Sequence, residues 1–143
     1  MRNEMLFLLA TLLLLAGGCS NPPIRPVGAS LKYDGVYRST EKPLHYWNYL
    51  RFYPDGEVME VSSTGTPDDL RNWFNEENLE LRRGKFTIDG KSLTFSTVSS
   101  QGDVDYTGEV DGDHIHLNIY SHINHYQESD VYVFVRWQTE QNP

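Results

Sequence analysis

Beyond residue 32 the chain alternates apolar and polar side chains with a period of two residues. That period is typical of β-strands with one buried face, and the segments that show it are rich in β-branched and aromatic residues. Strands are predicted at residues 34–39, 44–53, 57–63, 84–89, 92–99, 103–110, 114–123 and 129–137. Asp-Gly pairs at 55–56, 89–90 and 111–112 predict tight hairpin turns in which both central residues have positive φ. The sequence therefore predicts an all-β antiparallel meander, and eight such strands favour closure into a small barrel.

One segment departs from this period, TGTPDDLRNWFNEEN at residues 64–78. Thr66 has the side chain of a helix N-cap, proline follows at the first helical position, and Asp69 completes a capping box. These signals predict one short helix at residues 67–77. Its apolar face consists of Leu70, Trp73 and Phe74. Two interpretations of that face stay open: it packs as core against the sheet, or it covers the mouth of the barrel.

The strand period also predicts which bulky side chains point into the barrel, namely Phe52, Phe86, Phe95, Tyr106 and Phe134. An eight-stranded barrel is just wide enough to be filled by side chains or to hold one ligand. So many rings favour a mostly filled interior with a shallow pocket beneath the helix. The candidate residues for that pocket are Phe52, Trp73, Phe74 and Tyr106.

The N-terminus carries a separate signal. Arg2 precedes an apolar block at residues 5–16, which is shorter than the roughly 20 residues that span a bilayer. The block ends in LLAGGC, and this motif resembles the lipobox of bacterial lipoproteins. The resemblance implies that residues 1–18 are a signal peptide and that Cys19 becomes the lipid-carrying N-terminus. The alternative is an ordinary secretory signal, in which the single cysteine of the chain would have no explanation.

Residues 19–31 then form a proline-rich tether, residues 32–139 the barrel domain, and residues 140–143 a tail. In lipoproteins of this kind the residue after the cysteine directs sorting, and Ser20 favours the outer membrane. The resemblance therefore implies a protein of the bacterial cell envelope, held on the outer membrane by its lipid and facing the periplasm.

Both ends of the predicted barrel resemble the calycin pattern of lipocalins and their relatives. DGVY places Gly35 and Tyr37 at the opening of the first strand, and FVRW places Arg136 in the last strand. The resemblance implies that the Arg136 guanidinium covers the Tyr37 ring and joins the first strand to the last. Such a cation–π contact contributes about 0.5 to 2 kcal/mol. Both residues are structural in this interpretation.

A longer motif, YWNYLRFYPDGEV at residues 46–58, is similar to the C-terminal β-domain of a family of F-box proteins. DGVY upstream and RGKF downstream extend the likeness to about a third of the chain. That domain is regarded as a recognition or interaction module, so the resemblance implies binding and carries over no catalytic residue. The residues themselves require only a strand, a Pro-Asp-Gly turn and a second strand.

Histidines are concentrated near the predicted strand at 114–123. His114 and His116 share one face of it with Asn118, Tyr120 and His122, opposite an aliphatic face of Ile115, Leu117 and Ile119. Two imidazoles at this spacing with a third nearby are the minimum for an open zinc site. A solvent-facing polar stripe explains the same pattern, and no cofactor or tight metal site is expected.

The net charge of the chain and the motifs it lacks reduce the number of functions to consider. The chain has 12 Lys and Arg against 20 Asp and Glu, a net charge of -8, which disfavours nucleic acid as a partner. Motifs for phosphate binding, zinc proteolysis and a nucleophile elbow are absent from the sequence. The expected function is a non-enzymatic binding or interaction module on a lipid anchor, whose partner is an envelope protein or a small apolar ligand. The alternatives are a carrier of a small hydrophobic ligand and a metal-binding calycin that uses His114 and His116.

Overall fold

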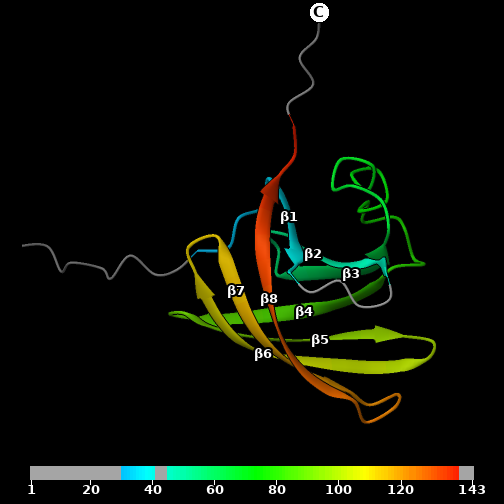
Figure 1. The fold of residues 1–143 in the computed structure, drawn as a ribbon, viewed down its shortest axis with the longest axis vertical. Helices are drawn as coiled ribbons and strands as arrows, with labels where there is room; N and C mark the ends of the chain where they lie inside the picture. The colour runs from blue at the N-terminus through cyan, green and yellow to red at the C-terminus, as the bar shows by residue number, and fades with distance from the viewer. Residues whose placement is uncertain (1–29, 41–44, 139–143) are drawn as a thin grey trace, which may run out of the picture.

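The computed structural model describes residues 30–40 and 45–138, within which eight strands form an antiparallel meander closed into a barrel (Figure 1). The strands are β1 (Gly35–Ser39), β2 (Trp47–Phe52), β3 (Glu57–Ser63), β4 (Arg82–Asp89), β5 (Ser92–Ser99), β6 (Gly102–Asp111), β7 (His114–Ser121) and β8 (Gln127–Arg136). Each strand pairs with the next, and β8 pairs with β1. The predicted eight-stranded antiparallel barrel is confirmed. The expected signal peptide, Cys19, most of the tether and the tail lie outside the described residues.

The Asp-Gly turns form, but with a different backbone geometry from the one expected. In the β4–β5 and β6–β7 hairpins the aspartate is the last residue of its strand and stays in the ladder. Glycine then takes the first turn position, with φ of 60° at Gly90 and 61° at Gly112. Among described residues other than glycine, only His45 and His125 have positive φ. The expectation of positive φ at both central residues was therefore wrong, because strand pairing holds the aspartates extended.

The barrel interior is packed mainly with aromatic and aliphatic side chains that alternate inward along the strands. Phe52 is fully buried, and its ring meets those of Tyr37, Phe86 and Phe95 edge-on at centroid distances of 5.6, 5.2 and 5.5 Å. The Phe95 ring stacks on the Tyr106 ring at 4.4 Å. Aromatic pairs of these geometries add about 0.5 to 1.5 kcal/mol each beyond their burial. The aromatic residues predicted to point inward do fill much of the barrel.

A second apolar cluster packs on the outer face of β1, β2 and β3. It consists of Val36, Tyr49, Tyr53, Met59, Leu70 and Phe74, flanked by the partly buried Trp47, Val61, Leu81 and Trp137. Leu70 and Phe74 come from the long connection between β3 and β4, which lies beside the barrel in Figure 1. The connection therefore shields one side of the barrel from solvent.

The connection is a series of turns, so the prediction of a helix at residues 67–77 was wrong. The predicted cap does form, since Asp69 accepts a hydrogen bond from the Thr66 amide at 2.9 Å. Most of the following backbone bonds span three residues, as from the Arg71 amide to the Asp68 carbonyl. Helices this short are marginal without tertiary support. Here the packing of Leu70 and Phe74 on the sheet determines the backbone.

The two ends of the barrel differ. The closed end carries the β2–β3, β4–β5 and β6–β7 turns, and Leu31 is buried there as part of the interior core. The Lys32 amide donates to the Tyr37 hydroxyl at 2.9 Å, and the Lys32 ammonium pairs with Asp113 in the β6–β7 turn. The open end carries the remaining connections. The chain thus enters the barrel at its closed end.

Candidate ligand pocket at the open end of the barrel

A cavity of about 740 Å³ lies at the open end, and we refer to it as the mouth pocket. Its aromatic lining is Tyr46, Tyr106, Tyr126 and Tyr132. Its charged lining is Glu60, Glu80, Arg82 and Glu128. Its aliphatic lining is Val61, Leu81, Val104, Ile119 and Ile123, and its neutral polar lining is Asn48, Ser62, Gln101, Ser121 and Asn124. A concave site of this size with a few convergent polar groups is suited to a small organic ligand.

Buried polar groups meet at the inner part of the mouth pocket. The half-buried Glu60 carboxylate from β3 accepts a hydrogen bond of 2.7 Å from the Thr97 hydroxyl of β5, which is fully buried. Burial and the nearby Glu60 raise the pKa of Tyr106 far above its usual range. Burial likewise raises the pKa of Tyr132, and the carboxylates Glu60, Asp130 and Glu128 add to the effect. Both phenols are therefore neutral hydrogen-bonding groups at physiological pH.

The rim of the mouth pocket is apolar and exposed. Ile123 and Tyr126 in the β7–β8 connection are 41% and 55% exposed. The Tyr126 hydroxyl donates a hydrogen bond of 3.2 Å to the Glu128 carboxylate, which also lines the pocket. At the same end of the barrel, Leu79 and Val98 are also exposed apolar side chains. The entrance therefore offers contact area to an apolar group.

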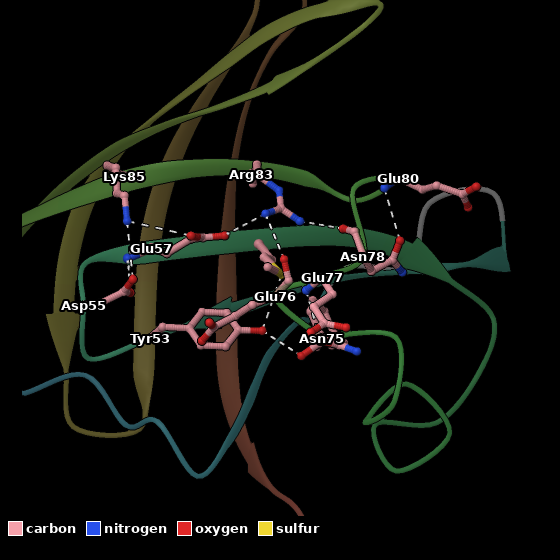
Figure 2. Close-up of polar contacts among 12 residues, drawn as sticks. Tyr53, Asp55, Glu57, Asn75, Glu76, Glu77, Asn78, Glu80, Arg83 and Lys85 are labelled. Atoms are coloured by element: carbon pink, nitrogen blue, oxygen red, sulfur yellow. Dashed lines mark hydrogen bonds and ion pairs between the residues drawn. The ribbon is translucent and has the colours of Figure 1, made fainter.

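The connection between β3 and β4 is held in place by polar contacts that Figure 2 shows. The Arg83 guanidinium donates to the backbone carbonyls of Glu76 and Asn78 at 3.2 and 2.5 Å, and pairs with Glu57 at 3.3 Å. The Tyr53 hydroxyl donates to the Phe74 carbonyl at 2.7 Å. These bonds position the end of the connection, where Glu80 and Leu81 enter the pocket wall.

Of the four predicted pocket residues, the structure places only Tyr106 in the lining of the mouth pocket. Phe52 lies in the interior core, and Phe74 is buried in the outer cluster. Trp73 is 53% exposed. The structure thus does not bring the four predicted pocket residues together, because Leu70 and Phe74 pack on the outside of the sheet.

Sequence reasoning did not single out Glu60, Glu128 or Tyr132. For Glu60 a signal was present, since it shares the inward face of β3 with Val58. A carboxylate at an inward position of a strand is costly unless it is hydrogen-bonded or reaches solvent, and it therefore marks a site. For Tyr132 and Glu128 the alternation of β8 is less informative, because that strand carries apolar residues on both faces.

The structure separates Tyr37 from Arg136. Tyr37 is fully buried and pairs in register with Phe134, whose ring lies 5.2 Å away. Arg136 lies across from Gly35, is largely exposed, and pairs with Asp34 at 2.6 Å. The cation over the Phe134 ring is Lys32, at 5.2 Å. Closure between β1 and β8 thus depends on aromatic packing and backbone pairing, in place of the expected guanidinium on the Tyr37 ring.

The histidine strand has the predicted alternation. His114 and His116 are exposed on the outer face of β7, whereas Ile115 and Leu117 are buried. His122 follows the strand and contacts Asp105 at 2.6 Å. Within residues 30–40 and 45–138, no group of three or more His, Cys, Asp or Glu side chains is arranged to hold a metal ion.

Asp105 also accepts a hydrogen bond of 2.5 Å from the Ser96 hydroxyl. That bond, followed by the contact with His122, lowers the pKa of the Asp105 carboxyl. The Ser96, Asp105 and His122 side chains form a surface chain of hydrogen bonds in which the serine contacts the aspartate. This order differs from a catalytic triad, where the histidine contacts the serine.

Comparison of the chain with family models, curated proteins and solved structures finds no match. In the part of the chain that the structure describes, no helix has the length and apolar character needed to cross a membrane.

Proposed function

We propose that this protein is a lipid-anchored component of a bacterial cell envelope whose barrel is a non-enzymatic binding module. The mouth pocket is its ligand site. The observation that carries the proposal is the position of this pocket at the open end, lined by buried Tyr106 and Tyr132 and by three carboxylates. The described lining consists of phenols, hydroxyls, amides, carboxylates, one guanidinium and aliphatic groups, which recognise ligands by hydrogen bonding, charge and apolar contact.

The geometry of the barrel agrees with an anchor at Cys19. The described chain begins at Ser30, and Leu31 is buried at the closed end. A tether over residues 19–31 reaches about 3.1 Å per residue where it is extended. The tether would then join the barrel at its closed end, and the mouth pocket lies at the opposite end.

A carrier of a small hydrophobic ligand is the second candidate. Val104 and Ile119 in the wall of the mouth pocket favour it, together with the exposed Ile123 at the rim. The three carboxylates in the same lining favour a polar or charged ligand instead.

Native mass spectrometry of the protein purified from the bacterium that produces it tests the proposal. Ser121 lines the mouth pocket, whereas Ser129 is exposed on the outer face of β8. We expect a one-to-one small-molecule adduct on the wild type and on Ser129→Trp, and its loss from Ser121→Trp, whose indole fills the pocket. An adduct retained equally by both variants, or none on the wild type, would refute the mouth pocket as the ligand site.

A further inference from the structure

On the basis of the binding function proposed above, we infer that the mouth pocket binds an organic cation: an ammonium or guanidinium group carried on an apolar stem. The pocket combines carboxylates, aromatic rings and an aliphatic wall, which are the three features that such a ligand needs.

The charges of the pocket favour a cation. Among the described lining residues, the carboxylates Glu60, Glu80 and Glu128 stand against one cation, Arg82. None of these four side chains takes part in an ion pair among the described residues, although Glu60 and Arg82 lie opposite each other in the β3–β4 ladder. Among the described residues, the three carboxylates therefore outnumber the one cation of the lining, and none of them is held in an ion pair. A bound ammonium would supply the missing partner.

The surroundings of the Tyr132 hydroxyl show the same bias. Burial first, and then the carboxylates Glu60, Asp130 and Glu128, raise the pKa of Tyr132, whereas a hydrogen bond with Asn48 acts in the opposite direction. The three carboxylates thus place the hydroxyl in a negative electrostatic field. Because Tyr106 and Tyr132 are buried, this field acts where water screens it less than at the surface. An anionic ligand in the mouth pocket would meet repulsion from Glu60, Glu80 and Glu128.

The shape of the lining accommodates the rest of the ligand. Tyr46, Tyr126 and Tyr132 belong to the lining, and an aromatic ring attracts a cation placed over its face. Val104 and Ile119 form an apolar wall for an aliphatic or aromatic stem. The net charge of -8 on the chain also favours the approach of a cation by long-range attraction.

A matched series of ligands tests the inference: 4-phenylbutylamine, 4-phenylbutan-1-ol and 5-phenylpentanoate, which share a phenyl-terminated stem of four methylene groups and differ in charge. Calorimetric titration uses the full chain in a non-ionic detergent at pH 7 and low salt. We expect the amine to bind at least tenfold more tightly than the alcohol, and the carboxylate to be the weakest ligand. Glu60→Gln should weaken the amine at least tenfold while leaving the alcohol unchanged.

Two further variants test whether Glu60→Gln weakens binding by removing a charge or by disturbing the fold. Glu128→Gln, at the rim, should weaken the amine in the same direction as Glu60→Gln. Glu109→Gln, exposed on the outer face of β6 opposite His116, should leave the affinity unchanged. Each variant is compared with the wild type by thermal melting before titration.

The outcomes distinguish this inference from the function on which it rests. If the alcohol binds as tightly as the amine, the inference that the ligand is a cation is wrong, and the mouth pocket remains a ligand site. If the amine does not bind at millimolar concentration, the inference of a cationic ligand is wrong, whatever adduct native mass spectrometry detects. If the amine binds equally to Glu60→Gln and Glu109→Gln, the binding lies elsewhere and the inference fails.

Two sources could supply such a cation, a small amine or a lysine side chain of an envelope protein. The blocked tripeptide acetyl-Gly-Lys-Gly-amide and n-butylamine carry the same ammonium on the same four-carbon stem. Tighter binding of the tripeptide supports the cation as part of a protein, and tighter binding of n-butylamine supports a small molecule.

Discussion

The Thr97 hydroxyl donates a hydrogen bond of 2.7 Å to the Glu60 carboxylate inside the barrel. The two residues belong to β5 and β3, which are separated only by β4, so their bond passes over β4 on the inner face of the barrel. It holds one oxygen of the carboxylate at the inner part of the mouth pocket. The pairing therefore connects the stability of the barrel with the chemistry of its pocket.

Replacing Thr97 with valine keeps the shape of the side chain and removes the donor. We expect the free energy of unfolding to fall by about 1 kcal/mol, less than for a fully buried charged acceptor because Glu60 is only half-buried. Urea unfolding of the wild type and of Thr97→Val measures this difference in the free energy of unfolding. Thr94→Val, on the outer face of the same strand, serves as the control. Equal losses in both variants would contradict a specific role for the bond.

Alkaline pH should destabilise the barrel through Tyr106 and Tyr132. Burial, followed by nearby carboxylates, raises the pKa of both phenols in the folded state. In the unfolded chain a phenol ionises near pH 10. The unfolded state then binds fewer protons than the folded state, so stability is intact below about pH 10 and falls as pH rises above it.

Absorbance at 295 nm followed against pH measures phenolate formation. We expect part of the tyrosine signal to appear only together with unfolding, and Tyr106→Phe or Tyr132→Phe to reduce that part. Tyr33→Phe, which removes an exposed ring hydroxyl, should leave it unchanged. Full ionisation of every tyrosine in the folded protein would disprove this prediction.

Gly84 of β4 is required by the close approach of the neighbouring strand. A Cβ placed there would lie 1.7 Å from the backbone oxygen of Ser96. We expect Gly84→Ala to lower stability by about 3 kcal/mol or more, because backbone atoms must move to relieve the overlap. Gly90→Ala has open space but a positive φ of 60°, and should cost only about 1 to 2 kcal/mol. Thermal melts that rank the two variants in the reverse order would contradict the barrel register.

The connection between β3 and β4 should open locally when the Tyr53 hydroxyl is removed. Tyr53→Phe deletes the bond to the Phe74 carbonyl, which still receives the Arg51 guanidinium at 2.8 Å. We therefore expect a modest cost of about 1 kcal/mol. Amide hydrogen exchange in residues 64–81 should accelerate about fivefold while the strands are unaffected. Trp73→Ala, which removes an exposed ring, should change exchange little, and an equal effect would refute the role of Tyr53.

Lipidation is tested at Cys19, which lies outside the described residues. Cys19→Ala should abolish incorporation of a labelled fatty acid and shift the protein from the detergent phase to the aqueous phase. The reason is that the acyl chains supply about 0.8 kcal/mol per buried methylene and hold the protein on the bilayer. A variant that still incorporates the label would exclude lipidation at this cysteine.

The sequence by itself determined the strands and which side chains point inward. In β5, for example, Leu93, Phe95 and Thr97 are buried, and the residues between them are exposed. Strand identity and facing are local properties, because successive side chains of an extended chain point to opposite sides. The same alternation in β3 places Glu60 inward beside Val58, so one member of the pocket could have been recognised.

The tertiary structure alone decided the rest. The helix signals at Thr66 and Asp69 produce a capping contact, yet the burial of Leu70 and Phe74 on the sheet outweighs the small local preference for a helix. The mouth pocket takes residues from Tyr46 to Tyr132, which only closure of the barrel brings together. Closure also places Phe134, two residues before Arg136, against the Tyr37 ring. Hairpin turns fix the register between strands that follow each other in the chain. Which rings pack and which carboxylates meet also depends on the closure of β8 onto β1, a pairing between the two ends of the domain that no local pattern encodes.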